Sequence, residues 1–229
     1  MGSMYSFNNV QFGFLGHSGI LIKTAEGKRI AIDPYNVAPS VEKVDFILIT
    51  HSHYDHCSIK DIEHLSKKGT TIVVPADAQS KIVKVEGINM QVAEVGDEFP
   101  LNGSLKISVV PAYNVDKEFH PKSEGWFGYI VRIGEVVVYH AGDSDVIPEM
   151  DKLTGFGKKG NFLAVFLPVS GVYVMSPEEA AEVANRLNPS LAVPIHYGAG
   201  VAGTDEDAKR FVEICKGFGV NAVLLEKLG

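Results

Sequence analysis

The chain has 229 residues, of which 45% are hydrophobic and 21% are charged. This composition supplies enough apolar surface for a large core and excludes a low-complexity or disordered polymer. The 21 Lys and Arg residues are outnumbered by 28 Asp and Glu residues, which gives a formal charge of −7. A protein that binds nucleic acid through its phosphates needs the opposite sign, so we expect a small-molecule partner and no nucleic acid.

The beginning of the chain and its cysteines bear on where the protein works. Met1-Gly2-Ser3 precedes a second methionine, Met4, so residues 1–3 are expected to be a cloning remnant, and no export signal is recognisable. No apolar run approaches the ~18 to 20 residues of a membrane-spanning helix. Cys57 and Cys215 are too few for a disulfide framework. We therefore expect a cytoplasmic protein with free thiols and no membrane attachment; the sequence leaves a homo-oligomer open.

Short apolar runs rich in Val and Ile recur along the whole chain, and such runs are typical of β-strands. In chain order, we expect strands at Phe12–Leu15, Ile20–Ile22, Arg29–Ile32, Asp45–Thr50, Thr70–Val74, Leu105–Val110, Gly128–Ile133, Glu135–Tyr139, Leu163–Leu167, Leu191–Ile195 and Ala222–Leu225.

Helix signals lie between some of these strands. Ser176-Pro177-Glu178-Glu179 combines an N-cap serine, a proline at the first helical position and a glutamate at the third, which predicts a helix to about Leu187. A similar start at Thr204 leads into an apolar stripe that ends at Cys215. Shorter helices are expected near residues 58–67 and 76–84. Together these elements imply an α/β protein with two mixed sheets face to face and helices outside.

The most informative segment is Thr50-His51-Ser52-His53-Tyr54-Asp55-His56-Cys57, which directly follows a buried strand. Imidazole and carboxylate are ligands of first-row metals, and a loop at a strand end can direct such side chains at adjacent ions. We expect His51 and His53 to face one ion and Asp55 and His56 another. Without a cation, four such groups beside a buried strand would have to satisfy one another.

Two later strands end in residues of the same chemical type. Glu135–Tyr139 leads into His140-Ala141-Gly142-Asp143, and Leu191–Ile195 leads into His196. Three apolar strands thus each deliver candidate ligands at their carboxyl ends, which is how a site is built on a rigid sheet.

The order of these segments resembles the metallo-β-lactamase superfamily of metal-dependent hydrolases over nearly the whole chain. The resemblance rests on Gly16-His17-Ser18-Gly19, Asp33-Pro34, the His51-x-His53-x-Asp55-His56 signature, Gly142-Asp143 and His196. Three further segments most resemble the branch of L-ascorbate-6-phosphate lactonase: Tyr139–Asp143, Leu167-Pro168-Val169 and Pro194–Tyr197. The resemblance implies one domain over residues 1–229, a four-layer αβ/βα sandwich of two mixed sheets and outer helices, and a dinuclear site at one edge.

The family pattern implies a role for each metal ligand. It places His51 and His53 on the first metal, Asp55, His56 and His196 on the second, and Asp143 between both. The family also has a histidine after a Pro-Ala-x sequence, whereas Pro111-Ala112-Tyr113 is followed here by Asn114. Either His120 folds back to replace this ligand, or the Asn114 oxygen or a water takes its place.

This pattern implies hydrolysis. Two cations, with zinc expected and manganese or iron as alternatives, would activate a water for attack on a carbonyl or phosphoryl centre. Asp55 would orient this nucleophile and handle its proton as the catalytic residue. Redox di-iron relatives carry glutamate in place of His53 and have a flavin domain, which this chain lacks, so oxygen reduction is disfavoured.

Other side chains are candidates for supporting roles. His17 could contact the substrate or hold a loop, while Asp33 is expected to hold the histidine segment by hydrogen bonds. His140 is expected to make a structural hydrogen bond. The long polar loop of residues 113–127 is typical of a functional loop. Its Lys117, Lys122 and Trp126 are candidates to bind a small, anionic substrate; the alternative is that each lysine is a solvated surface charge.

Three functional classes follow from these features. The first is a hydrolase of a small lactone, ester or phosphoester. The second is a nuclease or phosphodiesterase of the same fold, which would require a basic surface or an inserted domain. The third is a non-catalytic metal-binding descendant, which only Asn114 suggests.

Overall fold

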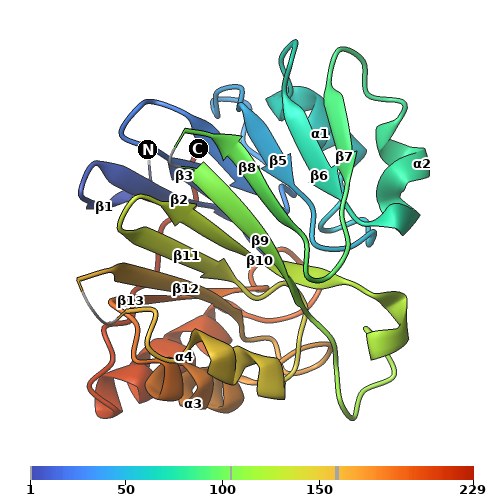
Figure 1. The fold of residues 1–229 in the computed structure, drawn as a ribbon. Helices are drawn as coiled ribbons and strands as arrows, with labels where there is room; N and C mark the ends of the chain where they lie inside the picture. The colour runs from blue at the N-terminus through green and yellow to red at the C-terminus, as the bar shows by residue number, and fades with distance from the viewer. Residues whose placement is uncertain (1, 104, 158–159) are drawn as a thin grey trace. The chain divides into compact units, whose positions relative to one another are not determined.

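A computed structural model describes residues 2–103, 105–157 and 160–229 of the chain. Contacts within the chain group into two compact units, the first formed by Met1–Ala93 with Leu225–Gly229 and the second by Glu94–Leu224. Each unit contains one β-sheet (Figure 1). That residues 1–229 form one domain stays a prediction.

The first unit contains a seven-stranded mixed sheet with its strands in sequence order. Its first four strands are antiparallel neighbours, and from the fourth strand onward the pairing is parallel. Its strands are β1 (Tyr5–Phe7), β2 (Val10–Gly16), β3 (Gly19–Lys23), β4 (Arg29–Ile32), β5 (Phe46–Leu48), β6 (Thr71–Val74) and β7 (Asn89–Val92).

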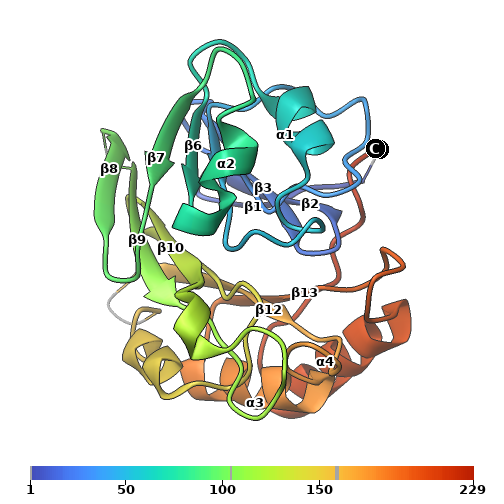
Figure 2. The same cartoon turned by 90° about the vertical axis from the view of Figure 1, so that its right-hand side faces the viewer.

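Short helices cover one face of this first sheet: α1 (Ile59–Leu65), the 3₁₀ helix η1 (Ala76–Ala78) and α2 (Gln79–Ile82) (Figure 2). Helix α1 begins at Ser58, whose side chain accepts a hydrogen bond from the Asp61 backbone and satisfies one of the amides at the helix start. Ile62 and Ile82 belong to the same buried apolar cluster as Ile47 of the sheet. Burial of these apolar faces holds the helices on the sheet.

The second unit contains a six-stranded mixed sheet in the order β13-β12-β11-β10-β9-β8. Strands β8 to β11 pair antiparallel, and β11, β12 and β13 pair parallel. Its strands are β8 (Glu98–Asn102), β9 (Leu105–Pro111), β10 (Phe127–Ile133), β11 (Val136–His140), β12 (Phe162–Pro168) and β13 (Leu191–Ile195).

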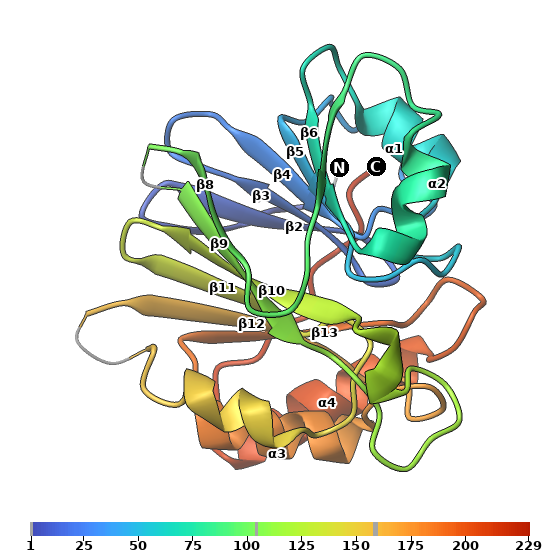
Figure 3. The same cartoon turned by 45° about the vertical axis from the view of Figure 1, so that its right-hand side comes forward.

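Two longer helices, α3 (Pro177–Leu187) and α4 (Asp205–Gly217), pack on this second sheet (Figure 3). They contact each other, α3 contacts β12 and α4 contacts β13. Both begin with the reciprocal N-terminal hydrogen bonds of a capping box, formed by Ser176 with Glu179 and by Thr204 with Asp207. The predicted starts of both helices are therefore confirmed. The second unit also contains the 3₁₀ helices η2 (Lys122–Glu124) and η3 (Pro148–Leu153).

The end of the chain completes the first unit. The Leu228 amide donates to the Phe14 carbonyl of β2 at 2.8 Å, and Lys227 Nζ donates to the Asn36 carbonyl at 2.8 Å. Gly13 lies so close to Leu228 that a Cβ at this position would come within 2.5 Å of its side chain. Residues 225–229 thus form a terminal strap along β2.

Most of the predicted strands are present, but the one expected at Ala222–Leu225 is wrong. Only Ala222 pairs there, in an isolated bridge with Ala192. Three strands, β1, β7 and β8, were not predicted, because they are short or polar and lack a continuous apolar run. Cys57 and Cys215 are buried free thiols, as expected. None of the helices in the described ranges is both long and apolar enough to cross a membrane.

Gly128 provides a test of packing in the second unit. A Cβ at this position would lie 2.4 Å from the His140 carbonyl oxygen and 2.8 Å from that of Ala141, and backbone atoms have little freedom to move away. We expect Gly128→Ala to lower the free energy of unfolding by about 2 kcal/mol or more. Gly217→Ala, at an open position of α4, is the matched control and should be neutral or stabilising by up to about 1 kcal/mol. Urea unfolding followed by circular dichroism would measure both, and equal stabilities would contradict the packing argument.

Candidate metal-binding clusters

The first candidate cluster lies at the carboxyl ends of the parallel strands β4 and β5. Ile32 pairs with Leu48, and the Asp33 amide donates to the Leu48 carbonyl at 3.0 Å. This register places Asp33 beside the segment that begins at Thr50 and contains the three clustered histidines. Ligand sites in α/β sheets form at such strand ends because side chains from neighbouring loops converge there.

Asp33 is fully buried and hydrogen-bonds to this segment at three points. Its Oδ1 accepts from the Thr50 amide at 2.8 Å, and its Oδ2 accepts from Thr50 Oγ1 at 2.6 Å. The same Oδ2 lies 2.8 Å from His56 Nδ1. When Nδ1 carries the proton of this bond, Nε2 carries the ring's lone pair, which is the form that binds a metal.

His51 and His56 are both buried, with their ring centroids 4.0 Å apart. One ligand atom each from Asp33, His51 and His56 lies within 4.8 Å of the others. The half-buried His53 ring lies 4.8 Å from that of His51. This set of imidazoles beside carboxylates fits a divalent cation of the zinc type, because it offers neutral nitrogen donors together with compensating negative charge.

His17 reaches the same cluster from the turn between β2 and β3. Its backbone has a φ of 55°, directly after Gly16 at 110°, so the chain reverses sharply and directs the ring inward. His17 Nε2 lies 2.9 Å from Asp55 Oδ2, and His56 Nε2 lies 3.5 Å from the same oxygen. The geometry therefore gives His17 a direct contact with the predicted catalytic carboxylate.

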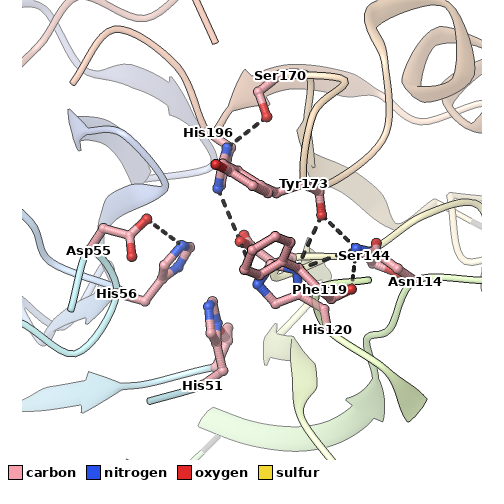
Figure 4. Close-up of polar contacts among 12 residues, drawn as sticks. His51, Asp55, His56, Asn114, Phe119, His120, Ser144, Ser170, Tyr173 and His196 are labelled. Atoms are coloured by element: carbon pink, nitrogen blue, oxygen red, sulfur yellow. Dashed lines mark hydrogen bonds and ion pairs between the residues drawn. The ribbon is translucent and has the colours of Figure 1, made fainter. Parts of the chain in front are cut away.

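The second candidate cluster lies at the carboxyl ends of β11, β12 and β13, within the second unit (Figure 4). Asp143 Oδ2 lies 3.0 Å from His196 Nε2 and 3.3 Å from His120 Nε2. Ser170 Oγ lies 3.0 Å from His196 Nδ1 and fixes the other side of that ring. All three charged or ionisable side chains are buried. The sequence-predicted residues Asp143, His196 and His120 are thus neighbours within one unit.

Asn114 holds the loop that carries His120. The backbone amide of Asn114 donates to the His120 carbonyl at 2.7 Å. The side-chain Nδ2 of Asn114 donates to the carbonyls of Phe119 at 2.7 Å and Tyr173 at 2.6 Å. Its buried Oδ1 accepts no hydrogen bond from the described residues. The imidazole of His120, rather than the Asn114 amide, faces the Asp143 carboxylate. Both remain predicted ligands, with His120 in the more favourable position.

The two loop lysines already have acidic partners. Lys117 Nζ contacts Asp145 Oδ1, and Lys122 Nζ lies 3.1 Å from Glu149 Oε1. Burial tends to raise the pKa of Glu149, but hydrogen bonds from Lys122, from its own backbone and from Tyr113 hold that pKa below its ordinary value. An anionic substrate would therefore compete with these carboxylates for the lysines.

The remaining candidates occupy defined positions in the second unit. The half-buried Trp126 ring lies 5.5 Å from the His120 ring. His140 is fully buried, and its Nδ1 accepts from the Gly142 amide at 3.2 Å, which stabilises the turn before Asp143.

Sequence reasoning did not identify Ser170, which binds His196. The available signal was its position: Ser170 follows β12 and is flanked by the two strands that deliver Asp143 and His196. Polar residues at the ends of adjacent parallel strands deserve equal consideration because they meet at one edge.

Comparisons with known proteins agree with this fold and chemistry. Residues 11–196 match the family profile described as the beta-lactamase superfamily domain. The chain is 34% identical over 199 residues to a UPF0173 metal-dependent hydrolase of Enterococcus faecalis, covering 80% of this chain and 84% of the relative. It is 33% identical over 225 residues to one of Thermococcus onnurineus, covering 89% and 92%.

A solved structure has the same fold. A presumptive metal-dependent hydrolase of Parabacteroides distasonis is similar with a TM-score of 0.81 and 28% identity, over 100% of this chain and 99% of that one. The protein is therefore a member of the beta-lactamase superfamily with the metallo-β-lactamase fold. Within it, the chain belongs to the UPF0173 family of metal-dependent hydrolases. The predicted fold class and the predicted enzyme class are confirmed.

Asp33 gives a first test of the first cluster. Asn at position 33 would place an amide donor against His56 Nδ1 and favour the tautomer whose Nε2 carries the proton. We expect Asp33→Asn to weaken metal binding by roughly 10- to 100-fold, the usual cost of losing such a partner. Competition with a chromophoric chelator would measure it. Asp116→Asn on the exposed loop is the control, and equal affinities of the two variants would contradict the role of Asp33.

His120 gives a test of the second cluster. Because its Nε2 lies 3.3 Å from Asp143, we expect His120→Ala to lower the number of ions bound per chain or to weaken one of them markedly. His64→Ala on α1 is the control and should bind metal as the unaltered protein does. Elemental analysis after dialysis would decide, and full metal content in His120→Ala would remove His120 from the ligand set.

Proposed function

We propose that the protein hydrolyses a lactone, ester or phosphoester bond of a small molecule, using two divalent cations. Zinc is the first choice for both, with manganese and iron as alternatives. The observation that carries the proposal is the pairing of buried imidazoles with buried carboxylates at the ends of parallel strands, Asp55 and Asp33 in one unit and Asp143 in the other.

The ligand assignment follows the family pattern. We assign His51 and His53 to one cation, Asp55, His56 and His196 to the other, and Asp143 to both. His120 is our choice for the remaining position, since its Nε2 faces Asp143. Cations bound by these side chains would supply Lewis acidity toward water and toward the bond to be broken.

Asp55 is the proposed general base. Its Oδ2 is held by His17 at 2.9 Å, and this contact limits the orientations that the carboxylate can adopt. A carboxylate fixed in this way can orient a water and accept its proton as attack proceeds. In this assignment His17 is a positioning residue, because it acts through Asp55.

Two features bear on the substrate. The resemblance of Tyr139–Asp143 and Pro194–Tyr197 to ascorbate-6-phosphate lactonase supports testing lactones first. Lys117 and Lys122 form ion pairs with Asp145 and Glu149. To bind an anionic group of a substrate, each lysine would have to give up its carboxylate partner. We therefore place lactones and uncharged esters before phosphorylated substrates.

The proposed function is tested by a substrate panel on the metal-loaded protein. We expect turnover of lactones or esters that a chelator abolishes and added metal restores. Turnover of a phosphodiester alone would favour the phosphodiesterase alternative. Bound metal without turnover of any ester, lactone or phosphodiester would favour a non-catalytic role.

Asp143→Asn tests the proposed bridging ligand. Loss of a partner that only orients a ligand costs about 10- to 100-fold, so loss of a shared ligand should lower kcat/KM by more than about 100-fold. Circular dichroism should show an intact fold. Asp151→Asn, at an exposed residue of η3, is the control. Near-normal turnover in Asp143→Asn would place this residue outside the metal ligands.

The double variant His51→Ala/His53→Ala tests the first ion. Each substitution removes a nitrogen donor, and we expect bound metal to fall below that of the unaltered protein. Elemental analysis provides the readout, which does not depend on a substrate. Unchanged stoichiometry would overturn the assignment of both histidines.

A further inference from the structure

A pocket of about 490 Å³ lies within the second unit, and none of its lining residues is a candidate metal ligand. Its floor is a row of cross-strand partners on one face of the sheet, in which Ser108 of β9 pairs with Ile130 of β10 and Ile130 pairs with Tyr139 of β11. Met150 and Leu153 of η3 form a wall. Most of this lining is apolar, so the pocket is suited to the hydrocarbon part of a ligand.

The two carboxylates of the pocket lining, those of Glu98 and Glu149, are paired with lysines that do not line the pocket. Glu98 accepts hydrogen bonds from Lys106 Nζ at 2.5 Å and from Ser108 Oγ at 3.0 Å. Glu149 accepts hydrogen bonds from Lys122 Nζ at 3.1 Å and from the Tyr113 hydroxyl at 2.9 Å. Neither lysine lines the pocket, so each carboxylate of the lining is compensated from outside it.

The lining also contains two cationic residues, Arg132 and Lys152. Within the described part of the chain, the Arg132 guanidinium forms no hydrogen bond and no ion pair; its Cζ lies over the Phe156 ring, 4.6 Å from the ring centroid. The hydrogen bond from Lys106 is the main cause of the lowered pKa of Glu98, and Arg132 contributes only through its field. Arg132 is half-buried, and a guanidinium with its Cζ over an aromatic ring can still offer its N–H groups to a carboxylate in the bidentate manner.

We propose that this pocket binds an amphipathic monoanion, a molecule with a single carboxylate on an apolar body. The carboxylate pairs with Arg132, with Lys152 adding positive charge at the exposed side. The apolar body lies along Ile130, Met150 and Leu153. This site is independent of the hydrolytic assignment, because it shares no residue with either metal-binding cluster.

Calorimetric titration of the full chain with octanoate tests the proposal. Octan-1-ol carries the same chain without the charge, and acetate carries the charge without the chain. We expect one saturable octanoate site per chain and binding of octan-1-ol and acetate at least tenfold weaker, since the site uses both parts of the ligand. Absence of saturable octanoate binding would overturn the proposal.

Three variants locate the site. Arg132→Met removes the guanidinium and keeps an unbranched side chain, so it should weaken octanoate at least tenfold and leave octan-1-ol unchanged. Ser108→Phe fills the pocket from β9 and should weaken both ligands. Arg210→Met removes a guanidinium from α4 and is the charge-matched control, expected to bind octanoate normally. Circular dichroism verifies that each variant is folded.

The outcomes separate the parts of the proposal. Loss of octanoate binding in Arg132→Met and Ser108→Phe, with normal binding in Arg210→Met, supports it. Equal binding in all variants places octanoate elsewhere and overturns it. If only Ser108→Phe weakens binding, Arg132 does not hold the carboxylate and the assignment of the ligand as an anion fails.

Discussion

Each buried imidazole of the two candidate clusters is held through one of its ring nitrogens, and this constraint determines what the other nitrogen can do. Asp33 holds Nδ1 of His56, and Ser170 holds Nδ1 of His196. In both rings Nε2 then lies beside a carboxylate, Asp55 in the first unit and Asp143 in the second. Both partner groups are buried, so the orientation of each ring is set before any cation binds, and the Asp33 carboxylate, which only accepts, also favours the His56 tautomer with its proton on Nδ1.

Both units bring such polar groups together with the same arrangement of strands. Each begins with an antiparallel run of strands and ends with parallel strands whose carboxyl ends carry the polar side chains. The backbone contributes as well, since Asp33, His120 and His196 have φ values of 45°, 58° and 62°. Non-glycine residues in this left-handed region cost about 1–3 kcal/mol each and persist only where the surroundings enforce them. Here the enforcement comes from hydrogen bonds to buried partners.

The sequence was most informative where structure is local. Capping signals placed α3 and α4, and apolar runs placed most strands, because both depend on neighbouring residues. The strand expected at Ala222–Leu225 failed because only one of its residues finds a strand partner. The position of His120 could not be derived either, since it depends on a loop closed by Asn114 and by the carbonyl of Tyr173, far along the chain. The partners of the loop lysines were hidden for the same reason.

The terminal strap makes the first unit discontinuous in sequence, whereas the second unit is one uninterrupted segment. The amide of Leu228 bonds to Phe14, so the first unit reaches its final contacts only after the whole of residues 94–224 has been synthesised. The unit that is translated first is therefore the last to be completed. A chain halted before the strap would leave β2 without its backbone partner at Phe14, where chaperones or neighbouring chains could pair with it.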